Sequence, residues 1–298
     1  MADGADPTHE LISDGWFGEK EVMWPGQQMR LKVENVLFAE KSKFQDVLVF
    51  DSSTYGRVLV LDGVIQLTER DEFAYQEMLT HIPMFAHAVC PKNVLIVGGG
   101  DGGMLREVMK HPGVEHVTMC DIDAMVPEVS KKYLPSMSVA FSDPRLELVC
   151  EDAAVFVAAD ARKYDVIIVD STDPVGPAAS LYEPTFYKSM RDVLTADGVI
   201  ATQGECMWLH LELIEEVMAP CAALFESVDY CYATVPTYPS GQIGFILLSM
   251  GTDVREGRRE VTAEMQAQLR YYNPAIHKAA FVLPQFAEQI IAKVRKVQ

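Results

Sequence analysis

The feature that most limits the fold is an alternation of apolar runs and helical patterns that begins near Lys92. Short continuous apolar runs are typical of strands buried on both faces, and apolar residues three or four apart are typical of helices. The predicted strands lie in NVLIVGGG, HVTMCDID, RLELVCED, YDVIIVD and GVIATQGE, and helices are predicted in MLREVMKH and MVPEVSKKYL. This order predicts an α/β fold with a mostly parallel sheet, helices on both faces and ligands beyond the carboxyl ends of the strands.

The chain before this alternation has a different pattern. MRLKVENVLFAE, QDVLVFDS and GRVLVLDGVIQLTE are β-rich and separated by turn signals, among them the hairpin dipeptide Asp62-Gly63. We expect a small antiparallel β domain at residues 1–73, followed by a catalytic domain at residues 74–298. A small sheet has exposed edges and an apolar face, so we expect it to pack on a partner subunit or on the next domain.

The rest of the chain continues the α/β pattern less regularly. A helix is predicted in WLHLELIEEVMAPCAALF, and VDYCYATVPTY and GQIGFILLS are predicted to pair as strands across the PTYPSG turn. From Thr262 we expect a helix, then a loop at YYNPAIH, and a closing amphipathic helix from Pro284.

Composition excludes several classes of function. The 25 Lys and Arg residues against 43 Asp and Glu give a net charge of −18, which argues against nucleic acid as a partner and is compatible with cationic substrates. No apolar run approaches the roughly 20 residues that span a bilayer, and the acidic N-terminus is unlike a secretory signal. The six cysteines form no CxxC pair or zinc spacing. We therefore expect a cytoplasmic protein with reduced thiols, no membrane contact and no metal site.

A glycine-rich loop follows the first predicted strand of the alternation. The loop VGGGDGG, residues 97–103, allows a ligand to approach the backbone closely, but it lacks the dinucleotide spacing GxGxxG. The next strand ends about twenty residues later in Asp121 and Asp123, where an acid can bind ribose hydroxyls. The pattern favours a nucleoside bound without a phosphate, and a tight turn with no ligand is the alternative.

Acidic residues recur where these predicted strands end. Asp101 follows the first strand, Asp152 the third, and Asp170 and Asp173 the fourth. A single such acid is an ordinary turn or helix-capping residue, and for Asp101 position alone does not separate a cap from a ligand. Several around one crevice indicate a ligand that carries hydroxyl groups and positive charge.

Five segments carry a family resemblance. LDGVIQLTERDEFAYQEML, VGGGDGGMLREV, DSTDPVGPAASLY, GECMWLHLELI and PTYPSGQIGF closely resemble the spermidine synthases of the polyamine aminopropyltransferase family, and the resemblance runs from about Gly15 to Ala292. It implies a Rossmann-like fold of the methyltransferase type and transfer of the aminopropyl group of decarboxylated S-adenosylmethionine to putrescine. It also implies that this nucleoside is a co-substrate, that no cofactor is permanently bound, and that the protein is a homodimer whose N-terminal domain mediates dimerisation and forms part of the amine pocket.

The resemblance also implies roles for individual residues. Asp170 takes the proton-acceptor position, assisted by Tyr75. The co-substrate positions are Gln45, Gly98, Gly99, Gly100, Asp101, Asp121, Asp152 and Ala153. The putrescine positions are Tyr75, Gln76, Asp170, Ser171, Thr172, Asp173, Gln203 and Tyr238, and Glu205, Trp24 and Trp208 match residues near the amine pocket.

Two departures and three alternatives remain. Asp121 stands where many members have glutamate, and Glu151-Asp152-Ala153 replaces a common GDG, which leaves the affinity for the nucleoside open. The alternatives are a spermine or thermospermine synthase, an enzyme like the putrescine N-methyltransferases, and an inactive regulatory paralogue. Asp101 opposes methyl transfer, because a carboxylate there repels the carboxylate of ordinary S-adenosylmethionine and attracts the ammonium of the decarboxylated form.

Overall fold

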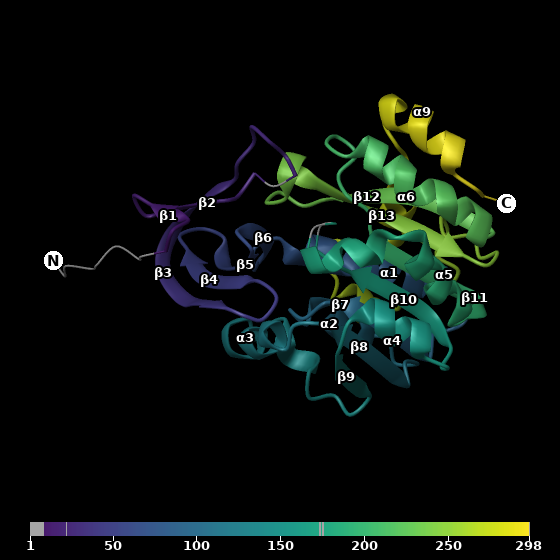
Figure 1. Ribbon diagram of the computed structural model, residues 1–298. Helices are drawn as coiled ribbons and strands as arrows, with labels where there is room; N and C mark the ends of the chain where they lie inside the picture. Colours follow the sequence, from purple (N-terminus) through teal and green to yellow (C-terminus); the bar gives the residue numbers. More distant parts are fainter. Residues whose placement is uncertain (1–8, 22, 173, 175, 298) are drawn as a thin grey trace.

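The computed structural model describes residues 9–21, 23–172, 174 and 176–297, and these form two sheets with helices packed mainly around the second (Figure 1). The first sheet is antiparallel, with strand order β1-β2-β3-β4-β5-β6. Its strands are β1 (Ile12–Ser13), β2 (Trp16–Gly18), β3 (Arg30–Lys41), β4 (Asp46–Ser52), β5 (Gly56–Leu61) and β6 (Val64–Thr68).

The hairpin between β5 and β6 forms where the dipeptide Asp62-Gly63 predicts it. Leu61 pairs with Val64, and Asp62 and Gly63 have φ angles of 49° and 88°. Positive φ at both central residues is the backbone of a type I′ turn, whose twist matches the two strands. The predicted antiparallel unit is therefore confirmed.

The second sheet has the order β12-β13-β11-β10-β7-β8-β9. The strands from β11 to β9 are parallel, and β13 pairs antiparallel with both β11 and β12, so the predicted, mostly parallel sheet is confirmed. Its strands are β7 (Asn93–Gly98), β8 (His116–Asp121), β9 (Leu146–Cys150), β10 (Tyr164–Asp170), β11 (Leu194–Gln203), β12 (Ser227–Thr234) and β13 (Gln242–Ser249).

Helices cover both faces of this sheet, which explains the continuous apolar runs. In β10, Val166 and Ile168 face one hydrophobic cluster, while Ile167 and Val169 face another. The first cluster lies under α1 (Glu72–Ala86), α2 (Gly103–Met109), α7 (Ala263–Gln266) and α8 (Pro274–Ala279), and the second under α4 (Ala153–Ala159), α5 (Pro184–Asp192), α6 (Leu211–Leu224) and α9 (Gln285–Val294).

The two sheets are joined through α3 (Met125–Tyr133). Val47, Val49 and Leu59 of the first sheet share a hydrophobic cluster with Val126 and Val129 of this helix, which lies beside β4 in Figure 1. This packing holds the β5–β6 hairpin over the second sheet.

One local prediction is wrong. The segment YYNPAIH is not a loop throughout, because α8 begins at Pro274. The side chain of Asn273 accepts hydrogen bonds from the backbone amides of Ala275 and Ile276 at 3.0 Å, which caps the helix. In the part of the chain that the structure describes, no helix is long and apolar enough to cross a membrane.

Candidate active site

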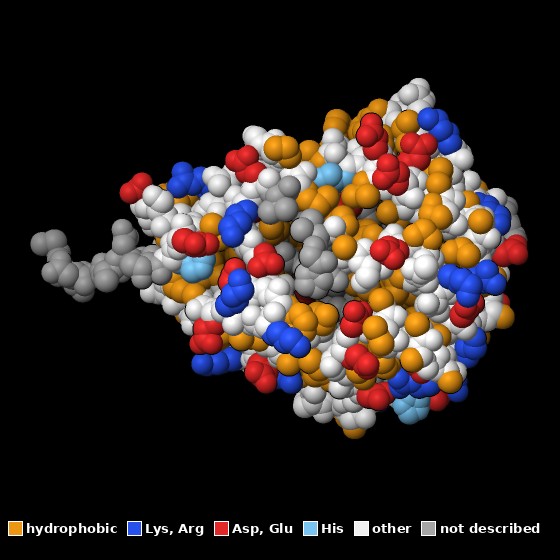
Figure 2. Space-filling view, viewed as in Figure 1, with side chains coloured by type: hydrophobic (Ala, Val, Ile, Leu, Met, Phe, Trp, Pro, Cys, Tyr) orange, Lys and Arg blue, Asp and Glu red, His pale blue; other side chains and the backbone are white. Residues whose placement is uncertain are grey.

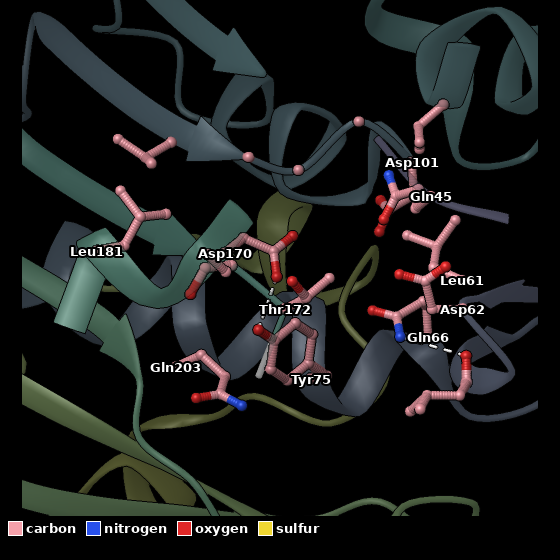
Figure 3. A pocket seen from close by; sticks show the side chains of 18 of the residues that line it. Gln45, Leu61, Asp62, Gln66, Tyr75, Asp101, Asp170, Thr172, Leu181 and Gln203 are labelled. Carbon is pink, nitrogen blue, oxygen red and sulfur yellow. Dashed lines mark hydrogen bonds between the residues drawn. The ribbon is translucent and has the colours of Figure 1, made fainter. Parts of the chain in front are cut away.

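A cavity of about 310 Å³ lies between the carboxyl ends of the central strands and the β5–β6 hairpin. The strand order places the ends of β8, β7, β10 and β11 side by side, so Asp121, Asp101, Asp170 and Gln203 follow one another along the cavity. In Figure 3, Asp170, Tyr75 and Gln203 lie on one side and Asp101 and Gln45 on the other (Figure 3).

Contacts within the protein itself require glycine at two positions of the loop at the end of β7. Gly98 has a φ of 76°, and a Cβ atom there would lie 2.1 Å from the carbonyl oxygen of Asp170. A Cβ atom on Gly100 would lie 2.6 Å from a carboxylate oxygen of Asp121. Both positions exclude larger residues because neighbouring strand ends converge here.

Asp170 and Tyr75 are directly connected. The Tyr75 hydroxyl donates a hydrogen bond of 2.6 Å to Oδ1 of Asp170, and both residues line the cavity. Burial raises the pKa of Asp170 to about 6, with the charge of Asp121 adding to the rise and the bond from Tyr75 opposing it. Burial and the neighbouring Asp170 raise the pKa of Tyr75 well above 10, so Tyr75 remains a proton donor.

Asp101 is both a local turn residue and a cavity residue. Its Oδ1 accepts a hydrogen bond of 2.6 Å from the amide of Gly103 at the start of α2, and its side chain lines the cavity. Burial and the nearby charge of Asp170 raise the pKa of Asp101 well above its ordinary value, although the bond from Gly103 opposes this. The cap and ligand interpretations are therefore compatible.

Asp121, the last residue of β8, and Asp123, which follows it, have different roles. Asp121 lines the cavity, and burial raises its pKa to about 6. Asp123 accepts hydrogen bonds from Ser42 at 2.6 Å and from Nε2 of Gln45 at 2.9 Å, so it holds the turn between β3 and β4. Asp121 is thus the acid placed to meet a ligand, and Gln45 lines the same part of the cavity.

Asp152 and Ala153 also line the cavity. Asp152 is the N-cap of α4, and its Oδ1 accepts from the amide of Ala154 at 2.8 Å. The second carboxylate oxygen of this cap is not used in that bond, so a capping residue can also bind a ligand donor.

The other side of the cavity, beyond Asp170, is lined by polar and aromatic groups. Ser171 and Thr172 come directly after β10, and Gln203 is the last residue of the neighbouring strand β11; all three line the cavity. Oε1 of Gln203 accepts a hydrogen bond of 3.1 Å from the Tyr182 hydroxyl. Tyr238 donates a hydrogen bond of 2.7 Å to the carbonyl oxygen of Gln66, and its ring contacts that of Tyr75 edge-on with the centroids 5.7 Å apart. Trp24 and Glu205 line this end as well.

Three predicted site residues are not found in the described cavity wall. Gln76 is absent from the described cavity wall; its Nε2 lies 3.3 Å from both carboxylate oxygens of Asp101, behind that residue. The prediction that Trp208 lies near the amine pocket is wrong, because Trp208 is not among the described residues that line the cavity. It is 59% exposed, and its ring contacts that of Phe286 in a tilted arrangement with the centroids 4.6 Å apart. Asp173 lies outside the described residues.

Several cavity residues were not found from the sequence. Leu59, Leu61, Ile65 and Gln66 come from the β5–β6 hairpin, and His210 comes from the turn before α6. The alternation of the hairpin residues predicts that one face is buried, but not what it faces. His210 lies within the resembling segment GECMWLHLELI, which was the available signal.

The charges of the site favour a cationic ligand. Asp101, Asp121 and Asp170 are partly buried around one cavity, and desolvation raises the pKa of each. A positive ligand offsets both the repulsion and the desolvation cost, because opposite charge favours the ionised carboxylate. Among the described residues, no group of three or more His, Cys, Asp or Glu side chains is arranged to hold a metal ion.

Comparison with known proteins identifies the family of this chain. The sequence model of the spermine/spermidine synthase domain matches residues 72–258, and that of the spermidine synthase tetramerisation domain matches residues 15–69. The chain belongs to the spermidine synthase family. It is 52% identical over 278 residues to the spermidine synthase of Dictyostelium discoideum, covering 93% of this chain and 98% of the relative. It is 51% identical over 289 residues to that of Schizosaccharomyces pombe, covering 96% and 97%.

Solved structures of the family have the same fold. The crystal structure of a spermidine synthase in complex with the transition-state analogue AdoDATO superposes with a TM-score of 0.86 at 34% identity, covering 98% of this chain and 99% of that one. The spermidine synthase of Thermotoga maritima gives 0.85 at 35% identity, covering 96% and 98%. The Rossmann-like fold with an N-terminal antiparallel domain is thus shared along nearly the whole chain.

Proposed function

We propose that the protein transfers the aminopropyl group of decarboxylated S-adenosylmethionine to putrescine, giving spermidine and methylthioadenosine. It is an aminopropyltransferase, as its relatives at about half identity are spermidine synthases by name. The observation that carries the proposal is the partly buried carboxylate of Asp101 in the cavity wall. It attracts an aminopropyl ammonium and repels the carboxylate of ordinary S-adenosylmethionine.

The proposed contacts follow the order of the strands. The nucleoside occupies the end near β8 and β7, where Asp121 takes the ribose hydroxyls, Asp152 takes the adenine amino group, and Asp101 takes the ammonium. Gln45, Gly98, Gly99, Gly100 and Ala153 complete this end. Putrescine lies near Tyr75, Asp170, Ser171, Thr172, Gln203 and Tyr238, with Asp173 as an anchor for its ammonium and Gln76 acting through Asp101.

Asp170 is proposed to remove the proton that blocks the reaction. Both amines of putrescine are ammonium at neutral pH, since their pKa is near that of lysine, about 10.4, and an ammonium cannot attack carbon. The sulfonium charge and desolvation lower the pKa of the attacking amine, Asp170 accepts its proton, and Tyr75 orients Asp170 through their 2.6 Å hydrogen bond. The amine nitrogen then bonds to the propyl carbon, and the carbon–sulfur electron pair stays on sulfur and neutralises the sulfonium. Alignment of the three atoms dominates this step.

Product analysis tests the proposal. The purified protein is incubated with decarboxylated or ordinary S-adenosylmethionine and, separately, with putrescine, cadaverine or spermidine, and products are identified by mass. We expect methylthioadenosine and spermidine. Release of S-adenosylhomocysteine from the ordinary form, spermidine as the preferred acceptor, or no product at all would each contradict it. The Asp101→Asn variant is expected to lose preference for the decarboxylated form.

We also propose a homodimer formed through an N-terminal domain of residues 1–73, with residues 74–298 as the catalytic domain and a cytoplasmic location. An oligomer is supported by the match of residues 15–69 to a tetramerisation domain. Trp16 on β2 is 42% exposed and offers apolar surface for association. The free thiols of all six cysteines suit a reducing compartment. Light scattering during gel filtration distinguishes a dimer from a tetramer, and a monomer at micromolar concentration would contradict the proposal.

A further inference from the structure

Behind the wall of the cavity, α1 and α2 meet through a row of polar side chains. Glu72 and Gln76 are four residues apart and therefore lie on one face of α1. Nε2 of Gln76 lies 3.3 Å from both carboxylate oxygens of Asp101, and Glu72 pairs with Arg106 of α2. Glu72 is therefore held one helical turn from the residue that contacts Asp101.

Arg106 binds Glu72 at two points. Its Nη1 donates a hydrogen bond of 3.0 Å to Oε1 and its Nη2 one of 2.8 Å to Oε2, and Glu72 is 7% exposed. Two parallel bonds between a guanidinium and a carboxylate give both strength and a fixed geometry. Neither residue is among the described residues that line the cavity. The pair can therefore affect a ligand only through the residues in front of it.

Negative charge surrounds Asp101. Desolvation raises its pKa, the charge of Asp170 raises it further, and Glu72 adds to the rise, while hydrogen bonds from neighbouring amide groups oppose it. Among the described residues that line the cavity there is no lysine or arginine, so no cationic side chain offsets this repulsion from inside the cavity. Arg106 offsets part of it from behind, because it pairs with Glu72.

We propose that the Glu72–Arg106 pair sets how strongly the pocket prefers a nucleoside that carries an ammonium group. This rests on the proposed use of decarboxylated S-adenosylmethionine, whose ammonium Asp101 takes. Arg106 cancels a buried negative charge close to Asp101. Without Arg106, Glu72 would favour the protonated, neutral form of Asp101, which does not attract an ammonium. Glu72 and Arg106 are thus positioning residues that act through the charge of Asp101.

Other ionisable groups also face Asp101 or the pair. They are Asp170 and Tyr75 beside the cavity, Asp121 at the end of β8, and Glu107, Lys110 and His81 in the network behind Arg106. All of them remain in place when Glu72 or Arg106 is replaced, so a difference between such variants reports the pair itself.

Two nucleosides that differ in one group measure the preference. Propylthioadenosine and aminopropylthioadenosine share the adenosine, the thioether and the propyl chain, but only the second ends in an ammonium. The ratio of their dissociation constants is measured by calorimetry from about pH 5.5 to 9, where an amine with a pKa near that of lysine, about 10.4, stays charged. The wild-type protein should prefer the aminopropyl compound at high pH and lose this preference as Asp101 becomes protonated.

The two single variants should move this loss in opposite directions. Arg106→Gln leaves the carboxylate of Glu72 without its cation, so the pH at which half of the preference is lost should rise by about one unit or more. Glu72→Gln removes that carboxylate and leaves the charge of Arg106, so the same midpoint should fall. The double variant should return close to the wild type. Arg106→Lys is the matched control, because it keeps the charge without the two-point bond, and its midpoint should also stay close to the wild type.

A pair that only supports the fold would give a different result. The midpoint would then stay at the same pH, or move in the same direction in both single variants, and either result would overturn the proposal. If Arg106→Gln does not fold, Glu72→Gln decides alone, because Arg106 keeps a partner in Glu107 at 2.8 Å, and a midpoint that does not fall would overturn the proposal. No preference for aminopropylthioadenosine in the wild type at any pH would instead contradict the proposed role of Asp101, on which the inference rests.

Discussion

Burial and two neighbours, Tyr75 and Asp121, set the pKa of the Asp170 carboxylate. Burial raises its pKa to about 6, the Tyr75 hydroxyl bonds to one oxygen, and the charge of Asp121 adds repulsion. A base with a pKa nearer to neutrality accepts a proton better than an ordinary aspartate, provided that it is ionised when the amine arrives. The cationic co-substrate would ensure this by favouring the charged form.

Replacing Asp170 by asparagine tests its role as proton acceptor. We expect turnover to fall by roughly 10²- to 10⁴-fold, the usual contribution of a positioned base, with little change in nucleoside affinity. Single-turnover rates and equilibrium binding of methylthioadenosine measure the two effects. Tyr75→Phe should cost less, because Asp170 keeps its charge. Near-normal turnover of Asp170→Asn would contradict the assignment of Asp170 as the proton acceptor.

The raised pKa of Asp170 also predicts how activity depends on pH. In the free enzyme the carboxylate becomes protonated below about pH 6, so kcat/KM for the nucleoside should decline below that value. The bound sulfonium lowers the pKa of Asp170, so the decline in kcat should begin at lower pH. Rate profiles over about pH 4.5 to 8 measure both. Declines of kcat and kcat/KM at the same pH, near the ordinary aspartate value, would contradict this.

The start of α1 shows how one element positions two parts of the site. Asp71 is the N-cap residue, but its side chain does not cap the helix. It accepts hydrogen bonds from the Thr68 hydroxyl at 2.6 Å, from the Thr237 amide at 2.9 Å and from the Thr237 hydroxyl at 2.8 Å. This buried carboxylate ties β6 and α1, which carries Tyr75, to the turn that carries Tyr238.

Thr237→Val should loosen this connection without changing the size of the side chain. The hydroxyl bond to Asp71 is lost while the amide bond remains, which should cost about 1 to 3 kcal/mol of unfolding free energy. We expect KM for the amine to rise several-fold and kcat to change less, because Tyr238 loses support. Thr195→Val is the control, since its hydroxyl bonds to Asp165 at the opposite end of β10 and β11. Equal amine KM values in the two variants would count against this role.

Helices differ in how well their sequences predict them. The surface helix α9 is recognised from Pro284 because Ala287 and Ile291 recur at helical spacing and face the core. The longer helix α1 is not recognised from apolar spacing. Nearly all its residues are buried, His81 and Glu77 among them, so it lacks a one-sided apolar pattern.

Across the molecule, a buried polar network joins α1 to α2. His81 contacts His111 at 3.1 Å and Oε2 of Glu107 at 3.0 Å, and Glu107 also pairs with Arg106 and Lys110. Burial and the positive charges of its neighbours lower the pKa of His111 well below 6.5, although Glu107 opposes this. His111 is therefore neutral in the folded protein.

The neutral state of His111 predicts a loss of stability in acid. Below about pH 6.5 the unfolded chain binds a proton at this histidine and the folded protein does not, so the unfolding free energy falls as pH decreases. Asp121 and Asp170 act in the opposite direction, because their raised pKa values let the folded state bind protons first. Urea unfolding at about pH 7.5 and 5.5 should show a smaller acid loss in His111→Gln and a larger one in Asp170→Asn. Unchanged pH dependence in His111→Gln would contradict the prediction.

Charged side chains of both signs are distributed over the surface (Figure 2). The face in Figure 2 carries acidic side chains interspersed with Lys and Arg, and the basic residues do not merge into one extended patch (Figure 2). With a net charge of −18, the whole molecule has the sign of field that attracts polyamines.

The sequence by itself determined the alternation of strands and helices along the chain, the β5–β6 hairpin, and the glycine loop with acids at the strand ends. These are local patterns, because alternation and turn chemistry depend on neighbouring residues. The resemblance also supplied Tyr75 and Asp170, whose contact the structure shows. Only the tertiary structure decided that Asp121 faces the cavity while Asp123 holds the turn between β3 and β4. It also decided that Trp208 lies outside and that His210 meets Glu205. Such choices depend on packing between segments distant along the chain, which no local pattern encodes.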